Sequence, residues 1–119
     1  MSAARAADLD AAFVPRRVAA AYTVEIDGDA IVLDEARNRL HLLNASAALV
    51  WACYDGSTTL HDIARDLAVA TGVPLPGMVA DVLAITRSLG VEGLVEGVVG
   101  DAAGTGVAVP DVEVSGPPA

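Results

Sequence analysis

Residues 39–56, RLHLLNASAALVWACYDG, constrain the fold of this chain more than any other stretch. A short strand ends there in Leu42-Leu43, and an apolar helix that carries the only tryptophan begins directly afterwards. Asn44 is the predicted N-cap, because its side-chain oxygen can accept a backbone N–H two or three residues on. Asp55-Gly56 predicts the end of the helix, since glycine readily adopts the left-handed conformation that closes helices. The chain therefore changes from strand to helix at one defined residue.

The segment before this switch has the period-two alternation of a sheet. Tyr22, Val24 and Ile26 alternate with polar residues, which is typical of a half-buried strand. Asp27-Gly28 follows and predicts a tight hairpin, because glycine tolerates a positive φ. Residues 30–33 form the second expected strand and residues 39–43 the third. The simplest arrangement is a three-stranded antiparallel meander.

The remainder of the chain predicts three helices. The first follows Asn44, and the second begins after the hydroxyl-bearing residues 57–59 and ends at Thr71-Gly72. The second helix has an apolar stripe at helical spacing, formed by Leu60, Ile63, Ala64, Leu67 and Ala68. A third helix is expected over about residues 76–89, with an apolar side made of Met78, Val79, Val82, Ile85, Thr86 and Leu89. The expected fold class is α+β, a three-stranded antiparallel sheet followed by three helices.

The ends of the chain are poor in core-forming side chains. Residues 1–14 are expected to form a flexible N-terminal arm, and residues 15–96 the folded domain. Residues 97–119 are rich in Gly, Ala, Val and Pro and are expected to be a disordered acidic tail. The alternating valines between residues 107 and 114 leave a short additional strand open as an alternative.

Charge and cysteine content limit the classes of function. The net charge is −9, and the scattered basic residues disfavour binding of a nucleic-acid duplex. The single cysteine, Cys53, excludes an internal disulfide and is expected to be a buried thiol in a cytoplasmic protein. Neither a signal peptide nor an apolar stretch long enough for a membrane span is recognisable.

The chemistry-bearing side chains predict no enzyme. His41 and His61 lie in different elements without the spacing of metal ligands, so neither a metal site nor a cofactor is expected. No nucleophile motif surrounds Cys53 or a serine. His41 alternates with Leu40 and Leu42 and should point to the opposite sheet face, where it is either solvated or in contact with a peptide.

The predicted sheet leaves one strand unpaired on one side. In a meander, residues 39–43 lie at an edge, whose free N–H and C=O groups can bind an extended peptide as an added strand. The third helix could form the other wall of that site; alternatively, its apolar residues Met78, Val82, Ile85 and Leu89 are all buried beneath the sheet. An unoccupied edge strand also allows pairing with a second copy of the chain, as a homodimer.

Two stretches carry a family resemblance. LLNASAALVWACYDGSTTLHDIARDLA, over residues 42–68, and DVLAITRSLGVEGLV, over residues 81–95, resemble the PqqD family, whose members are also called RiPP recognition elements. The shared features are the Leu-Asn before a small-residue helix with Trp, the Asp-Gly turn with a hydroxyl-capped helix, and the Gly-containing end of the last helix. The resemblance covers about residues 14–96.

The resemblance implies a winged-helix-like fold without catalytic activity. Such proteins bind the leader region of a ribosomally made precursor peptide and present it to a peptide-modifying enzyme: a radical-SAM enzyme, a protease or a cyclase. The leader would add as a fourth strand beside the third strand, next to the third helix. Carried over by position, the strand residues are Arg39, Leu40, His41, Leu42 and Leu43, and the helix residues are Met78, Asp81, Val82, Ile85 and Leu89. The acidity of the domain predicts a leader with at least one basic residue.

The alternative is a winged-helix DNA-binding protein, which shares the strands and helices. Between residues 22 and 95 ten acids face four arginines, a balance of −6. The third helix carries only Arg87 as a base, whereas a helix that reads a DNA groove needs a basic, polar face. Charge therefore favours the peptide-binding hypothesis.

Overall fold

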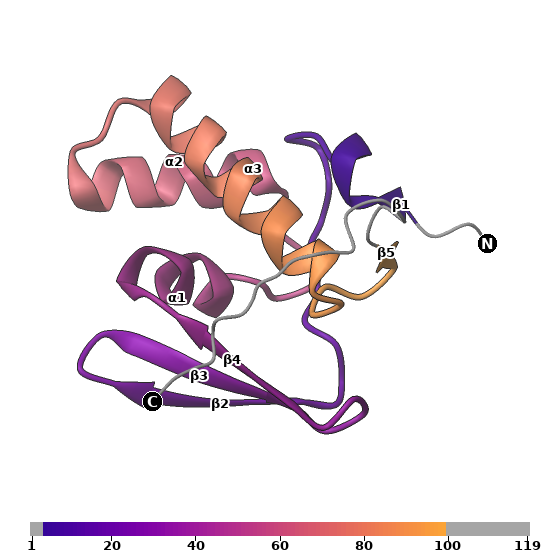
Figure 1. Cartoon of the computed structure of the whole chain (residues 1–119). Helices are drawn as coiled ribbons and strands as arrows, with labels where there is room; N and C mark the ends of the chain where they lie inside the picture. The colour runs from indigo at the N-terminus through magenta and orange to yellow at the C-terminus, as the bar shows by residue number, and fades with distance from the viewer. Residues whose placement is uncertain (1–3, 100–119) are drawn as a thin grey trace.

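The computed structural model of the chain describes residues 4–99. A three-stranded antiparallel sheet consists of β2 (Ala21–Ile26), β3 (Asp29–Asp34) and β4 (Arg39–Leu43), in the order β2-β3-β4. Three helices follow and lie together on one side of the sheet (Figure 1). The predicted α+β class and the predicted meander are confirmed.

Two turns fix the register of the strands. Asp27 and Gly28 both have positive φ, at 51° and 89°, and form a two-residue hairpin turn that pairs Ile26 with Asp29. The β3–β4 turn is built around the buried carboxylate of Asp34. This carboxylate accepts the backbone N–H groups of residues 36 and 37 and, at 3.1 Å, the Nη1 of Arg37. Each hairpin is therefore specified by its own turn residues.

The N-caps of α1 and α2 and the C-cap of α2 are those that the sequence predicts, whereas α1 ends at Ala52 with Cys53 as its C-cap, before the predicted end at Asp55-Gly56. α1 (Ala45–Ala52) begins after Asn44, whose Oδ1 accepts the N–H of Ala47 at 2.9 Å. α2 (Leu60–Thr71) begins after Thr59, and Gly72, with a φ of +80°, ends it. α3 (Leu75–Val91) is longer than expected at both ends.

The core lies between the inner face of the sheet and the helices. Trp51 and Tyr54 are its largest buried side chains, and each satisfies its polar atom. Trp51 Nε1 donates to Thr23 Oγ1 at 2.8 Å, which ties α1 to β2. The Tyr54 hydroxyl lies 2.6 Å from Thr86 Oγ1 of α3, and burial raises the pKa of Tyr54 strongly. These bonds fix the helices on the sheet.

The expectation of a flexible arm is wrong for residues 4–14, which pack against the domain. Ala6 and Leu9 are buried in the core, and the N–H of Leu60 donates to the carbonyl of Phe13 at 2.9 Å. η1 (Ala6–Asp8), a short 3₁₀ helix, lies against α3. The boundary predicted near residue 14 therefore falls inside the packed structure.

The end of the described chain is part of the same packing. β1 (Ala4–Arg5) pairs in parallel with β5 (Val98–Val99), so residues 98 and 99 belong to a strand. β5 and η1 meet α3 at Gly90, where an added Cβ would come within 2.7 Å of Val98 Cγ1 and would lie at an ordinary contact distance, 3.5 Å, from Ala6 Cβ. The missing side chain of Gly90 makes room for Val98. The rest of the expected tail, with its suggested strand over residues 107–114, lies outside the described residues.

Across residues 4–99, none of the helices has the length and apolar character needed to traverse a bilayer.

Candidate functional site

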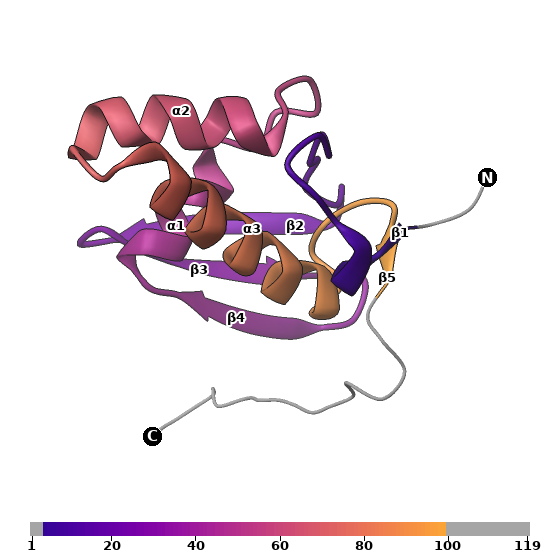
Figure 2. The same ribbon diagram turned by 90° about the horizontal axis from the view of Figure 1, so that it is seen from above.

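β4 lies at an edge of the sheet, as predicted, and pairs only with β3 among the described elements (Figure 2). The ladder alternates, so every second residue of β4 directs its backbone groups away from β3. The tight turn makes Ile26 and Asp29 a hydrogen-bonded pair, so Asp29 and every second residue after it in β3 bond to β2. The residues between them bond to β4, where their partners are residues 39, 41 and 43. The N–H and C=O groups of Leu40 and Leu42 therefore face the free edge.

The side chains of β4 point the opposite way from the prediction. Leu40 and Leu42 are 66% and 70% exposed, on the side of the sheet away from the helices. His41 faces the helices with only 10% of its side chain exposed. The register explains this, because His41 pairs with Val32, which is fully buried on the inner face. Of the two alternatives that the sequence leaves for His41, solvation is thus wrong.

A small charged cluster joins β4 to the end of α3. The Glu92 carboxylate lies 3.6 Å from Arg39 Nη2 and 3.6 Å from His41 Nδ1. Burial lowers the pKa of His41, and the nearby Glu92 only partly opposes this effect. The Nε2 atom of His41 is buried without a hydrogen-bond partner among residues 4–99. The imidazole of His41 is therefore neutral at pH 7 and lies on the inner side of β4.

One stripe of α3 lies on the side of Glu92. Asp81, Ile85, Ser88 and Glu92 follow one another at spacings of four, three and four residues, which places them on one helix face. Asp81 and Ser88 are exposed, and Ile85 and Glu92 are partly buried. Since Glu92 contacts β4, this face of α3 is the one associated with the edge strand. We call it the α3 stripe.

The predicted site residues divide between this stripe and the core. Asp81 and Ile85 belong to the α3 stripe, whereas Met78, Val82 and Leu89 are buried, as is Leu43 of β4. The three buried α3 residues lie on the face that packs against the rest of the domain, so they are not available as a wall. Sequence reasoning missed Ser88 and Glu92, although their spacing from Asp81 was the available signal.

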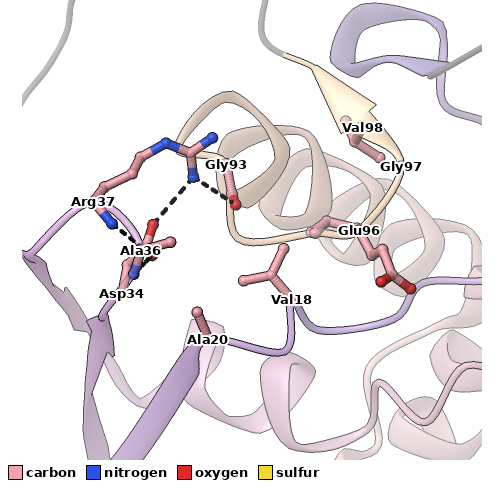
Figure 3. Close-up of a pocket in the computed structure, with 10 residues that line it drawn as sticks. Val18, Ala20, Asp34, Ala36, Arg37, Gly93, Glu96, Gly97 and Val98 are labelled. Atoms are coloured by element: carbon pink, nitrogen blue, oxygen red, sulfur yellow. Dashed lines mark hydrogen bonds and ion pairs between the residues drawn. The ribbon is translucent and has the colours of Figure 1, made fainter.

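A hollow of about 490 Å³ lies where the β3–β4 turn meets the segment after α3 (Figure 3). Arg37 Nη1 spans it, donating to Asp34 Oδ2 at 3.1 Å and to the Gly93 carbonyl at 3.3 Å. Glu96, also in its lining, pairs with Arg16 at 3.4 Å. The charged groups of the hollow are thus engaged in joining the hairpin to the end of α3, which fixes β4 relative to that helix.

Within the part of the chain that the structure describes, no three His, Cys, Asp or Glu side chains are grouped so that they could hold a metal ion. Cys53 is partly buried, and burial raises the pKa of its thiol. The thiol is therefore protonated at neutral pH, as expected for a side chain that acts in packing.

Comparison with known proteins places the fold. The sequence model of the family described as "Coenzyme PQQ synthesis protein D (PqqD)" matches residues 29–95. The solved structure "TbiB1 in Complex with the TbiA(beta) Leader Peptide" is similar, with 20% identity and a TM-score of 0.63, over 69% of this chain and 95% of that one. "Lasso peptide synthetase B1 complexed with the leader peptide" has 22% identity and a TM-score of 0.61, over 70% and 98%. No curated protein matches the chain.

Proposed function

The chain belongs to the PqqD family, and from this membership we propose that it binds the leader region of a ribosomally synthesised precursor peptide and presents it to a modifying enzyme. The two similar solved structures support the proposal, because both are complexes with leader peptides. The observation on this chain that carries it is the free edge of β4 beside the α3 stripe.

The proposed binding mode is addition of a fourth strand to β4. The leader would exchange backbone hydrogen bonds with Leu40 and Leu42, whose polar groups have no partner strand on that side among the described residues. Because side chains alternate along a strand, one set of leader residues would point toward the α3 stripe. The other set would lie on the outer face beside the exposed side chains of Leu40 and Leu42.

The expected affinity is moderate. Each strand hydrogen bond contributes about 0.5 to 1.5 kcal/mol net, and each buried apolar anchor adds roughly 1.5 to 3 kcal/mol. Ordering a disordered segment costs about 2 to 5 kcal/mol. At the midpoints of these ranges, four hydrogen bonds and two anchors leave about 5 kcal/mol, which is a dissociation constant of roughly 0.2 mM, and values near the upper ends reach about micromolar. Such reversible binding suits a protein that hands its peptide on.

Charge supports a preference for basic leaders. Asp81 is exposed on the α3 stripe, and the whole chain has a net charge of −9. A basic residue of the leader beside Asp81 would form an exposed ion pair, worth about 0.2 to 1 kcal/mol and weakened by salt. The same acidity argues against a DNA-binding function. The chemistry would belong to the partner, a radical-SAM enzyme, a protease or a cyclase, and the chain itself would be non-catalytic.

Backbone amide shifts test the proposed site. The uniformly ¹⁵N-labelled chain is titrated with overlapping synthetic peptides that span the leader of a precursor encoded beside its gene. The largest shifts are expected at Leu40, Leu42, Ile85 and Ser88, while amides in the middle of α2 stay in place and serve as the internal control. Saturable binding that shifts α2 and leaves β4 unchanged would reject the site, and the absence of binding to every leader peptide would reject the function.

A further inference from the structure

The sheet has a second free edge, formed by β2. This strand pairs only with β3 within residues 4–99. Since Ile26 and Asp29 are a hydrogen-bonded pair, the N–H and C=O groups of Thr23 and Glu25 face the free side of β2. The β2 edge is separate from the proposed leader site, because β3 lies between β2 and β4.

A hollow of about 340 Å³ borders the β2 edge, between the β2–β3 turn and α1. In Figures 1 and 2, α1 lies over the end of the sheet that carries this turn. Thr23 points to Trp51 on the inner side of the sheet, and Glu25, two residues on, points to the same side. The lining consists of Glu25, Gly28, Ala45, Ala48, Leu49 and Ala52. We call this space the α1 hollow.

The face of α1 that lines the hollow is apolar and partly exposed. α1 has the sequence ASAALVWA, in which only Ser46 is polar. Val50 and Trp51 are buried in the core, whereas Leu49 is 46% exposed. A helix that is apolar on all sides is normally buried on all sides. The exposed side of α1 therefore suits contact with an apolar side chain, for which the alanines of the hollow leave space.

The charges beside the hollow select the kind of strand that can pair with β2. Glu25 lines the hollow, and Asp27 and Asp29 adjoin the turn glycine of its lining. All three are exposed, and none forms an ion pair within residues 4–99, whereas Asp34 and Glu92 pair with arginines. An inward-pointing charge on an edge strand discourages pairing with apolar strands. Like charges opposite each other also disfavour an acidic strand, including β2 of a second copy, so the edge favours a basic strand.

We propose that the β2 edge and the α1 hollow bind an extended, basic segment of the enzyme to which the leader is presented. The segment would pair with Thr23 and Glu25 as an added strand and place a Lys or Arg opposite Glu25. An apolar side chain two residues away would lie on the same face of that strand and enter the α1 hollow. The inference rests on the proposed function, which requires an enzyme in addition to the leader. Leader and enzyme would occupy opposite edges of one sheet, so both can be bound at once.

Binding to the modifying enzyme encoded beside the gene of this chain tests the proposal. The enzyme is immobilised, and the full chain, saturated with its leader peptide, is passed over it in surface plasmon resonance at low and high salt. Wild type should bind, and more weakly at high salt. Glu25→Lys should weaken enzyme binding roughly tenfold or more, because it replaces an attraction by a repulsion. Glu35→Lys is the matched control at an exposed acid in the β3–β4 turn, and it should bind like wild type.

A second pair of variants tests the hollow without a change of charge. Ala52→Phe fills the α1 hollow and should weaken enzyme binding roughly tenfold. Ala70→Phe, at an exposed position on α2, should not. Far-UV circular dichroism establishes that each variant is folded.

Leader titration of the same proteins separates this inference from the proposed function. All four variants should bind the leader like wild type, because their changes lie away from the β4 edge. A leader-loaded wild type that does not bind the enzyme overturns the inference and leaves leader binding intact. Enzyme binding that survives both Glu25→Lys and Ala52→Phe overturns it as well, and would place the enzyme on another surface.

Discussion

Replacement of Leu42 by proline tests strand addition at β4 most directly. The Leu42 N–H points away from β3, so its loss removes no hydrogen bond of the sheet, and proline is tolerated at such edge positions. The same N–H is the donor that an added strand would use. Leu42→Pro is therefore expected to fold and to bind the leader peptide weakly.

The size of the effect follows from one missing hydrogen bond. A leader carbonyl that is buried beside residue 42 of this variant, without a donor, costs about 1 to 3 kcal/mol. This corresponds to a dissociation constant raised roughly 5- to 150-fold. Titration calorimetry at fixed salt measures the change, and thermal unfolding followed by circular dichroism shows whether the fold is retained.

Three matched variants isolate the backbone effect. Leu42→Ala keeps the N–H and separates the loss of the side chain from the loss of the donor. Glu25→Pro removes an N–H that faces the free edge of β2, by the same alternation, and should not affect binding. His41→Pro removes an N–H that bonds to β3 and should unfold the protein. A folded Leu42→Pro that binds within twofold of wild type, or a Glu25→Pro that weakens binding equally, would refute the reasoning.

Three further changes have defined outcomes. Asp81→Asn should weaken binding of a basic leader up to about fivefold at low salt and less at high salt. Asp66→Asn, at an exposed position on α2, should have no effect on binding. Fluorescence anisotropy of a labelled leader measures both affinities. The pKa of His41 is lower in the folded chain than in the unfolded chain, so the unfolded chain takes up this proton at a higher pH. His41 should therefore reduce the free energy of unfolding as the pH falls below about 6.5. The urea midpoints at pH 5 and pH 7.5 should differ less in His41→Leu than in wild type. Thr23→Val leaves the Trp51 Nε1 donor without its acceptor and should lower the free energy of unfolding by about 1 to 3 kcal/mol in urea titrations; an unchanged midpoint would show that water replaces the threonine.

Much of the fold could be predicted because its signals are local. Asn44, Thr59 and Gly72 act on backbone groups within a few residues, so the bounds of α1 and α2 are close to those expected. The hairpin at Asp27-Gly28 is equally local. With these turns in place, the sequence leads directly to a meander with β4 at its edge.

The inner and outer faces of the sheet could not be predicted in the same way. Alternation identifies two sets of residues on a strand, and the more apolar set is normally assigned to the core. In this chain the apolar residues of β2 and β4 lie outside, because the register with β3 puts Thr23 and His41 on the side of the sheet that faces the helices. The orientation of His41 was therefore predicted wrongly, because residue spacing does not show that the apolar set of side chains lies on the solvent side of the sheet.

The packing of residues 4–14 depends on a contact across the chain. Ala6 and Leu9 give too sparse an apolar pattern to indicate burial, and β5 fits beside them only because Gly90 has no side chain to meet Val98. The α3 stripe is half predicted for a similar reason. Asp81 and Ile85 of the stripe were predicted as site residues, but helical periodicity does not show which neighbouring element each face of α3 meets. Only the contacts of Glu92 with Arg39 and His41 show that this face meets β4.

The parallel pairing of β1 with β5 allows the domain to be circularly permuted. Ala4 and Val98 lie side by side, so a short glycine linker can join residue 99 to residue 4 without stretching the backbone. The exposed turn at Gly72 can then supply new ends between α2 and α3. Such a circular permutant would offer the β4 edge on a scaffold whose attachment point for a fused enzyme lies at a different corner of the molecule.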